Sequence, residues 1–105
     1  MIRMNNSEVL LFSHAGNVNG TGGRWNMTVW ASRDSAATWT PTIQVEPDAD
    51  VALHQAYSTL LQLSKTQALI VWERGPMRGS CKGYPGRCFQ PAGEYQTLRA
   101  RTIEV

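Results

Sequence analysis

The two cysteines, Cys81 and Cys88, are the most reactive side chains of the sequence, and their spacing limits what they can do. They stand seven residues apart in a stretch of turn-forming residues, so the chain between them can fold back on itself. A disulfide closing so short a loop would contribute roughly 2–3 kcal/mol in the chain-entropy model, and two free thiols are equally compatible with the sequence. A zinc site would need two more ligands at regular spacing, which His14 and His54 do not supply, so we expect no metal and no cofactor.

A second group of polar side chains has the spacing of a hydrogen-bonded turn. Residues 32–39 read Ser-Arg-Asp-Ser-Ala-Ala-Thr-Trp and resemble the Asp box, S-x-D-x-G-x-T-W, a turn between strands of a propeller blade. In such a turn a short Asp side chain accepts bonds from the turn backbone, and the Trp packs under the turn. Ala36 replaces the usual Gly, at a position that often needs unusual backbone angles. Asp boxes occur in unrelated carbohydrate-active and binding proteins, so the motif indicates a fold rather than a chemistry, and a plain Ser/Asp-rich hairpin remains the alternative. The motif positions are Ser32, Asp34, Thr38 and Trp39.

The elements that must position these residues are predicted to be strands. Short apolar or alternating runs, separated by turn-forming residues, are typical of antiparallel strands, whereas nothing in the chain has a clear helical period. The predicted fold class is therefore all-β and antiparallel. Between the last two strands lies a long Gly- and Pro-rich connection at 74–93, which contains both cysteines. The expected strands are 8–13, 25–32, 42–45, 57–63, 67–73 and about 94–104.

Composition excludes several classes of function. With 105 residues, 42% hydrophobic and 17% charged, the chain is predicted to fold as a small domain rather than to be disordered. A net charge of +2 is too small to predict a nucleic-acid partner. No apolar run is long enough for a membrane span or a signal peptide, so we expect a cytoplasmic location if the chain is complete. Three Asn-x-Ser/Thr triplets, at Asn5, Asn19 and Asn26, would matter only in a secreted chain.

The length also bears on the propeller interpretation. A blade is a four-stranded sheet of roughly 40–50 residues, so 105 residues provide about two blades. Two blades cannot close a ring, and their edges and faces would be bare. The chain is thus either another small β fold or a piece of something larger, and exposed blade edges predict self-association or assembly with another chain.

Four further motifs flank the turn at 32–39 in a recognisable order. Upstream stand Val-Leu-Leu-Phe-Ser-His at 9–14 and Arg-Trp-Asn-Met-Thr-Val at 24–29. Downstream stand Ala-Tyr-Ser-Thr-Leu at 56–60 and Ala-Leu-Ile-Val-Trp-Glu-Arg-Gly at 68–75. This order resembles the C-terminal part of the exo-α-sialidase (neuraminidase) family, across roughly residues 8–75. The resemblance implies about two blades of a six-bladed β-propeller, an Asp-box blade at about 8–55 and a last blade at about 56–105.

The resemblance also implies roles for three residues. Tyr57 matches the nucleophilic tyrosine, and Arg24 matches the third member of an arginine triad that binds the sialic acid carboxylate, with Arg33 as a rival if the register differs. Glu73 matches the acidic residue that orients the first triad arginine, although Trp72 replaces the usual Tyr before it. A neutral phenol suits attack beside the substrate's own carboxylate, where a second carboxylate would be repelled. Arginine suits that carboxylate because its planar fork binds two oxygens and stays charged.

Other parts of the family's site have no counterpart in the sequence. No segment resembles the N-terminal arginine motif, the Asp acid/base, the Glu partner of the tyrosine or the second triad arginine. We therefore expect a partial site for sialylated glycoconjugates that has no substantial activity alone, because groups that act as a unit lose catalysis together. The alternatives are a non-catalytic β module that binds a glycan or a protein, and a degenerate relative that keeps the fold without the chemistry.

Overall fold

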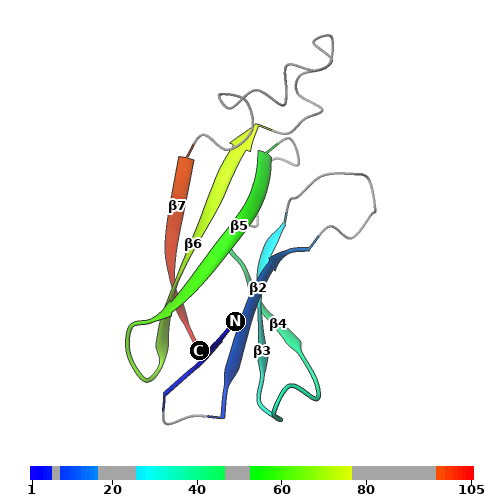
Figure 1. Ribbon diagram of the computed structural model, residues 1–105, viewed down its shortest axis with the longest axis vertical. Helices are drawn as coiled ribbons and strands as arrows, with labels where there is room; N and C mark the ends of the chain where they lie inside the picture. The colour runs from blue at the N-terminus through cyan, green and yellow to red at the C-terminus, as the bar shows by residue number, and fades with distance from the viewer. Residues whose placement is uncertain (6–7, 17–25, 47–52, 77–96) are drawn as a thin grey trace.

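The computed structural model describes residues 1–5, 8–16, 26–46, 53–76 and 97–105, and every regular element among them is a β-strand (Figure 1). The strands form two sheets in which all neighbouring pairs are antiparallel, which confirms the predicted all-β antiparallel class. Sheet A has the order β1-β2-β3-β4, with β1 at Ile2–Arg3, β2 at Leu10–Ala15, β3 at Met27–Ser32 and β4 at Thr40–Gln44. Sheet B has the order β5-β6-β7, with β5 at Leu53–Gln62, β6 at Gln67–Pro76 and β7 at Thr97–Glu104.

Each predicted strand has a counterpart, and the differences lie at strand ends. The two-residue strand β1 was not predicted, because two residues are too few to show an alternating pattern. β5 begins at Leu53, ahead of the predicted start at residue 57, and β6 continues to Pro76 into the predicted connection. Arg24, Cys81 and Cys88 lie outside the described residues. In the described part of the chain, no helix is long and apolar enough to cross a membrane.

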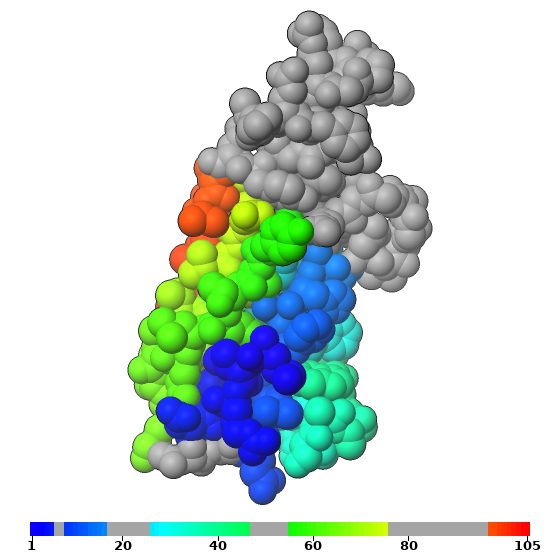
Figure 2. All heavy atoms as spheres, viewed as in Figure 1, coloured from blue at the N-terminus to red at the C-terminus, as the bar shows by residue number. Residues whose placement is uncertain are grey.

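The core lies between the two sheets. Alternating residues of β2 and β3 point inward from sheet A, and alternating residues of β6 and β7 point inward from sheet B, as the period of two in a strand requires. In Figure 2 the atoms of β5 lie against those of β1 and β2, and the side-chain oxygens of Ser13 and Ser58 are 2.8 Å apart across this junction. The residues buried in the core include Leu11, Val29, Ala68, Ile70, Trp72 and Ile103.

The opposite side of sheet B carries several exposed apolar side chains among polar ones. Tyr57, Leu61 and Leu63 are 69%, 58% and 50% exposed, and Leu98 on β7 is 72% exposed. Cross-strand pairing places Leu61 beside Leu69, and alternation along β6 and β7 puts their outward residues on the same side. We call this outer surface of sheet B the aliphatic face; its members are Leu61, Leu63, Leu69, Val71 and Leu98.

The outer side of sheet A has aromatic rings instead. Phe12 contacts Trp39 at a centroid distance of 6.0 Å and stacks on His14 at 5.2 Å. His14 in turn stacks on Trp30 at 6.1 Å. These four rings form what we call the aromatic row.

Candidate functional site

The turn at 32–39 is closed by side chains that hydrogen-bond locally. The Ser32 hydroxyl donates to Asp34 Oδ1 at 2.8 Å and accepts from the Ala36 backbone N–H at 2.9 Å. Asp34 Oδ1 also accepts from the backbone N–H of Thr38 at 2.8 Å, and its Oδ2 accepts from the Thr38 hydroxyl. These are the bonds from a short Asp to the turn backbone that the spacing predicts. Trp39 is half-buried and packs its ring against the edge of Phe12.

The backbone of this turn is strained at two residues. Ser35 and Ala36 have φ of 58° and 72°, in the left-handed region. For a residue with a Cβ this conformation costs roughly 1–2 kcal/mol, and glycine avoids the cost. Ala36 stands where the Asp-box pattern has its glycine, and its positive φ is a conformation that glycine would adopt without strain.

Hydrogen bonding changes the acidity of the turn's carboxyl. Donation from the Thr38 hydroxyl, then from the Thr38 backbone and from Ser32, lowers the pKa of Asp34 below its ordinary value of 3.8. Each of these bonds favours the charged form, because only the carboxylate accepts at both oxygens. The turn is therefore held by an ionised Asp34.

Tyr57 lies at an irregularity in β5. Gln55 pairs with Arg74 and Ser58 pairs with Trp72, so two residues of β5, Ala56 and Tyr57, oppose the single residue Glu73 of β6. This is a β-bulge, a feature that redirects a side chain and is frequent beside active sites. Ala56 points into the protein and is 2% exposed, whereas Tyr57 is 69% exposed. Two of the predicted site residues, Tyr57 and Glu73, thus lie opposite each other at the bulge.

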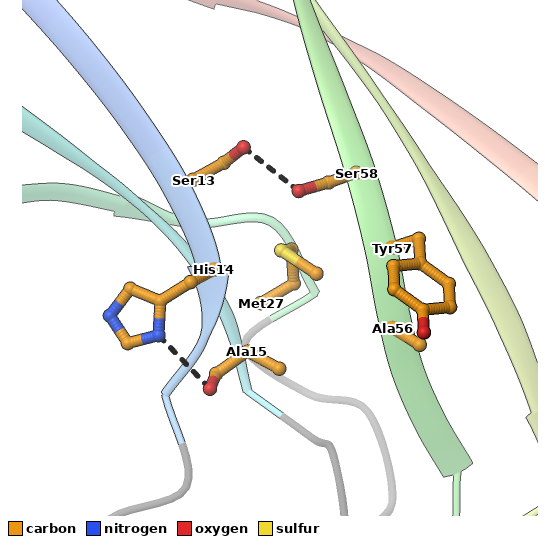
Figure 3. A pocket seen from close by; sticks show the side chains of 7 residues that line it. All are labelled: Ser13, His14, Ala15, Met27, Ala56, Tyr57 and Ser58. Atoms are coloured by element: carbon orange, nitrogen blue, oxygen red, sulfur yellow. Dashed lines mark hydrogen bonds between the residues drawn. The ribbon is translucent and has the colours of Figure 1, made fainter. Parts of the chain in front are cut away.

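An open pocket lies beside Tyr57, between the ends of β2 and β5 (Figure 3). Its volume is about 360 Å³. Figure 3 shows the Ser13 and Ser58 hydroxyls pointing toward each other across it, while His14 points away from Tyr57. Apolar side chains line the pocket together with two hydroxyls, an imidazole and a phenol. The lining residues are Ser13, His14, Ala15, Met27, Ala56, Tyr57 and Ser58.

Behind the bulge lies a polar network that the sequence did not reveal. The Gln55 side chain is 1% exposed. Its Oε1 accepts from the Met27 backbone N–H at 2.6 Å, and its Nε2 donates to Glu46 Oε2 at 3.2 Å. Glu46 also makes ion pairs with Arg74 at 3.1 Å and with Arg99 at 3.2 Å. Gln55 falls in the stretch 48–56, whose sequence shows no clear periodicity. No local pattern therefore indicated that this polar side chain would be buried.

The other predicted site residues differ in their distance from the pocket. Glu73 is half-buried on β6, and Arg33 is exposed in the turn after β3. Met27, the third residue after Arg24, begins β3 and lines the pocket, whereas Arg33 lies beyond the opposite end of that strand. Among the described residues, no group of three or more His, Cys, Asp or Glu side chains has an arrangement that could hold a metal ion.

A second pocket lies on the outer side of sheet A, next to the aromatic row. It has a volume of about 380 Å³ and is lined by residues around Trp30, including Thr28, Pro41 and Gln44. The indole nitrogen of Trp30 is buried and has no hydrogen-bond partner among the described residues.

The chain is similar to known sialidases. It is 38% identical over 68 residues to the sialidases of two Vibrio cholerae serotype O1 strains, classical Ogawa 395 and El Tor Inaba N16961. The match covers 64% of this chain but only 8% of each relative's length, so the chain spans a small part of these proteins. No protein-family model matches the chain. No solved structure matches it either. The similarity supports a relationship between this chain and the sialidases.

Proposed function

We propose that the chain carries part of a sialidase active site, in which Tyr57 is the nucleophile and terminal α-linked sialic acid is the substrate. The observation that carries the proposal is the position of Tyr57. In a chain similar to sialidases, this tyrosine is exposed at a bulge, opposite Glu73 and beside an open pocket. Such a bulge aims one side chain out of the sheet, as a nucleophile requires.

The chemistry proposed for Tyr57 is a double displacement with retention. The phenolic oxygen bonds to the anomeric carbon as the bond to the leaving oxygen breaks, and water later cleaves the tyrosyl-sugar bond. The phenol proton passes to a general base, and the leaving oxygen takes a proton from an acid. Both groups would come from outside the 105 residues, since no segment here resembles them.

Arg24 is the residue that we propose for binding the substrate carboxylate. Its rival, Arg33, follows Ser32 at the far end of β3, and Ser32 already lies about 17 Å along the strand from Met27 at 3.3 Å per residue. Met27 itself lines the pocket beside Tyr57. Arg33 is therefore a poor candidate for binding a substrate beside Tyr57, and the resemblance to sialidases assigns this role to Arg24. Glu73 would then orient another arginine of the same triad.

We further propose that sheets A and B are neighbouring blades of a β-propeller, at about residues 8–55 and 56–105, with residues 32–39 as an Asp box. Two observations support this. The bonding around Asp34 follows the Asp-box pattern, including a left-handed residue at the glycine position. The outer sides of both sheets carry apolar side chains, as they would if further sheets packed against them.

The test is a pair of measurements on the purified chain. We expect 3′-sialyllactose at millimolar concentration to shift the NMR signals of Met27 and Tyr57, and lactose to leave them in place. We expect no hydrolysis of a fluorogenic sialoside, because the acid and base are missing. Absence of any shift with 3′-sialyllactose would contradict the sialic acid site. Hydrolysis that Tyr57→Phe abolishes would contradict the partial-site proposal while supporting the role of Tyr57.

A second candidate is a glycan-binding module without catalysis, which the aromatic row favours. Aromatic faces beside polar groups are suited to sugar rings, and the pocket near Trp30 has both. In that case neutral oligosaccharides would bind, Trp30→Ala would abolish binding, and Tyr57→Phe would have no effect. The sialidase proposal instead predicts that 3′-sialyllactose binds, that lactose does not, and that Trp30→Ala has no effect.

A further inference from the structure

We infer that Gln55 is a positioning residue, which fixes Tyr57 at its bulge by tying β5 to the start of β3 and to Glu46. The inference rests on the proposed function, since it gives Tyr57 a role that depends on its position. Gln55 lies two residues before Tyr57 and is 1% exposed, yet its side chain is polar. Both ends of its amide are used: Oε1 accepts from the Met27 N–H at 2.6 Å, and Nε2 donates to Glu46 at 3.2 Å.

The pairing of β5 with β6 shows why this anchor matters. From Ser58 onward, the two strands pair regularly, beginning with Ser58 opposite Trp72. Continued backward without a bulge, the same ladder would set Tyr57 alone opposite Glu73 and would turn Gln55 to the outer side of the sheet. The extra residue of the bulge returns Gln55 to the inner side, where both of its partners lie. The two hydrogen bonds of Gln55 therefore form only when the bulge is present, and they in turn hold the bulge in place.

Glu46, the hydrogen-bond acceptor of Gln55, is also held by two arginine side chains. Its Oε2 is 3.1 Å from Arg74 Nε and its Oε1 is 3.2 Å from Arg99 Nε, and its side chain is only 15% exposed. Arg74 is also the residue that pairs with Gln55 across the strands. A carboxylate held by two guanidinium groups of sheet B is an acceptor whose position does not depend on Gln55.

The hydrogen bond between Gln55 and Met27 also links the strand of Tyr57 to the segment that follows Arg24. Met27, which donates to Gln55, is three residues after Arg24. Between them Asn26 has φ of 59°, and its backbone oxygen accepts from the Gly16 N–H at 3.0 Å, which holds this end of β3 against β2. Gln55 thus connects the strand of the nucleophile to the strand that follows the carboxylate-binding arginine.

The experiment replaces the anchor and observes Tyr57 directly by NMR. Gln55→Thr cannot reach either partner, and threonine is favourable on the outer side of a strand. We expect the bulge to straighten: Tyr57 pairs with Glu73 in a regular ladder, seen as new cross-strand proton contacts, and the ring signals of Tyr57 move. We expect the dissociation constant for 3′-sialyllactose to rise about tenfold, since misplacing one binding group by an ångström is costly.

The chain provides a matched control in Gln62→Thr. Gln62 is the same residue type on the same strand, and it also makes two hydrogen bonds, from the Asn5 N–H and to the Ser64 carbonyl, both at 2.8 Å. It pairs with Ala68 in the regular part of the ladder, away from the bulge. We expect Gln62→Thr to leave the Tyr57 signals and sialyllactose binding unchanged. Equal changes in both variants would overturn the inference, as would unchanged Tyr57 signals in Gln55→Thr.

A charge swap keeps the test decisive if Gln55→Thr does not fold. Gln55→Glu alone sets two carboxylates side by side, and we expect it to disturb Tyr57. Adding Glu46→Gln restores one carboxylate and one amide, so we expect the double variant to recover the Tyr57 signals of the parent. Failure of the double variant to recover them, in a folded protein, would overturn the inference. If the parent chain does not bind 3′-sialyllactose, the proposed function is contradicted. The inference about Gln55 is tested separately, because the Tyr57 NMR signals report on the bulge in the absence of ligand.

Discussion

At the scale of single residues, Asp34 has the greatest influence on the turn between β3 and β4. Its carboxylate accepts hydrogen bonds from the Ser32 hydroxyl and from both the backbone and the hydroxyl of Thr38. These donors lower its pKa in the folded chain below 3.8, the ordinary value. The folded state therefore binds the proton of this carboxyl less readily than the unfolded state does.

The first prediction concerns pH. The stability that Asp34 contributes is fully present above about pH 3.8 and is lost as the pH falls through the lower folded pKa, because protonation removes an acceptor. Asp34→Asn lacks this titration. We expect the difference in unfolding free energy between parent and Asp34→Asn, measured by urea unfolding from pH 7 to pH 2.5, to shrink below pH 4. A difference that stays constant across this range would contradict the role of the charged carboxylate.

The second prediction concerns the strained alanine in the same turn. Ala36 has φ of 72°, so glycine there removes a backbone strain, although it also makes the unfolded chain more flexible. We expect Ala36→Gly to raise the unfolding free energy by about 0.5–1 kcal/mol. The control is Ala37→Gly, next in the chain and also exposed but without positive φ, which should lower it slightly. Equal effects of the two variants would refute the strain at Ala36.

At the scale of elements, β6 is the central strand of sheet B and separates two environments. Ile70 is fully buried between the sheets, whereas Val71, its neighbour, lies on the aliphatic face and is half-buried. We expect Ile70→Ala to cost about 2–5 kcal/mol, from lost burial plus the cavity that it leaves. Val71→Ala should cost less than about 1 kcal/mol. Urea unfolding of both variants measures the contrast, and comparable losses would show that the outer side of sheet B is covered in solution.

The same strand illustrates what could be predicted from sequence. The alternation of Ala68, Ile70 and Trp72 with less buried residues reflects a period of two, which local sequence shows directly. The turn at Asp34 was also predictable, because its bonds join residues at most four positions apart. The bulge at Ala56 and Tyr57 was not, since it is stabilised by Gln55 reaching Met27, 28 residues away. Contacts of that length leave no local pattern.

At the scale of the whole molecule, the two sheets bury one side each and leave apolar side chains exposed on the other. The aliphatic face includes leucines that are 50–72% exposed, and the aromatic row covers the outer side of sheet A. Exposed apolar patches of this kind usually mark surfaces that pack against another layer. Both outer sides are therefore candidate surfaces for contact with another layer or another chain.

The last prediction follows from these uncovered sides. Because Leu98 is 72% exposed at the edge of the aliphatic face, the isolated chain should self-associate as its concentration rises. We expect Leu98→Lys to reduce this association and leave the unfolding free energy within about 0.5 kcal/mol of the parent, as for an exposed position. Sedimentation at several concentrations measures the association. Thr66→Lys adds the same charge at an exposed position of the turn between β5 and β6, away from the aliphatic face and the aromatic row, and should have no effect. If both lysine variants reduce association equally, net charge rather than the aliphatic face controls it.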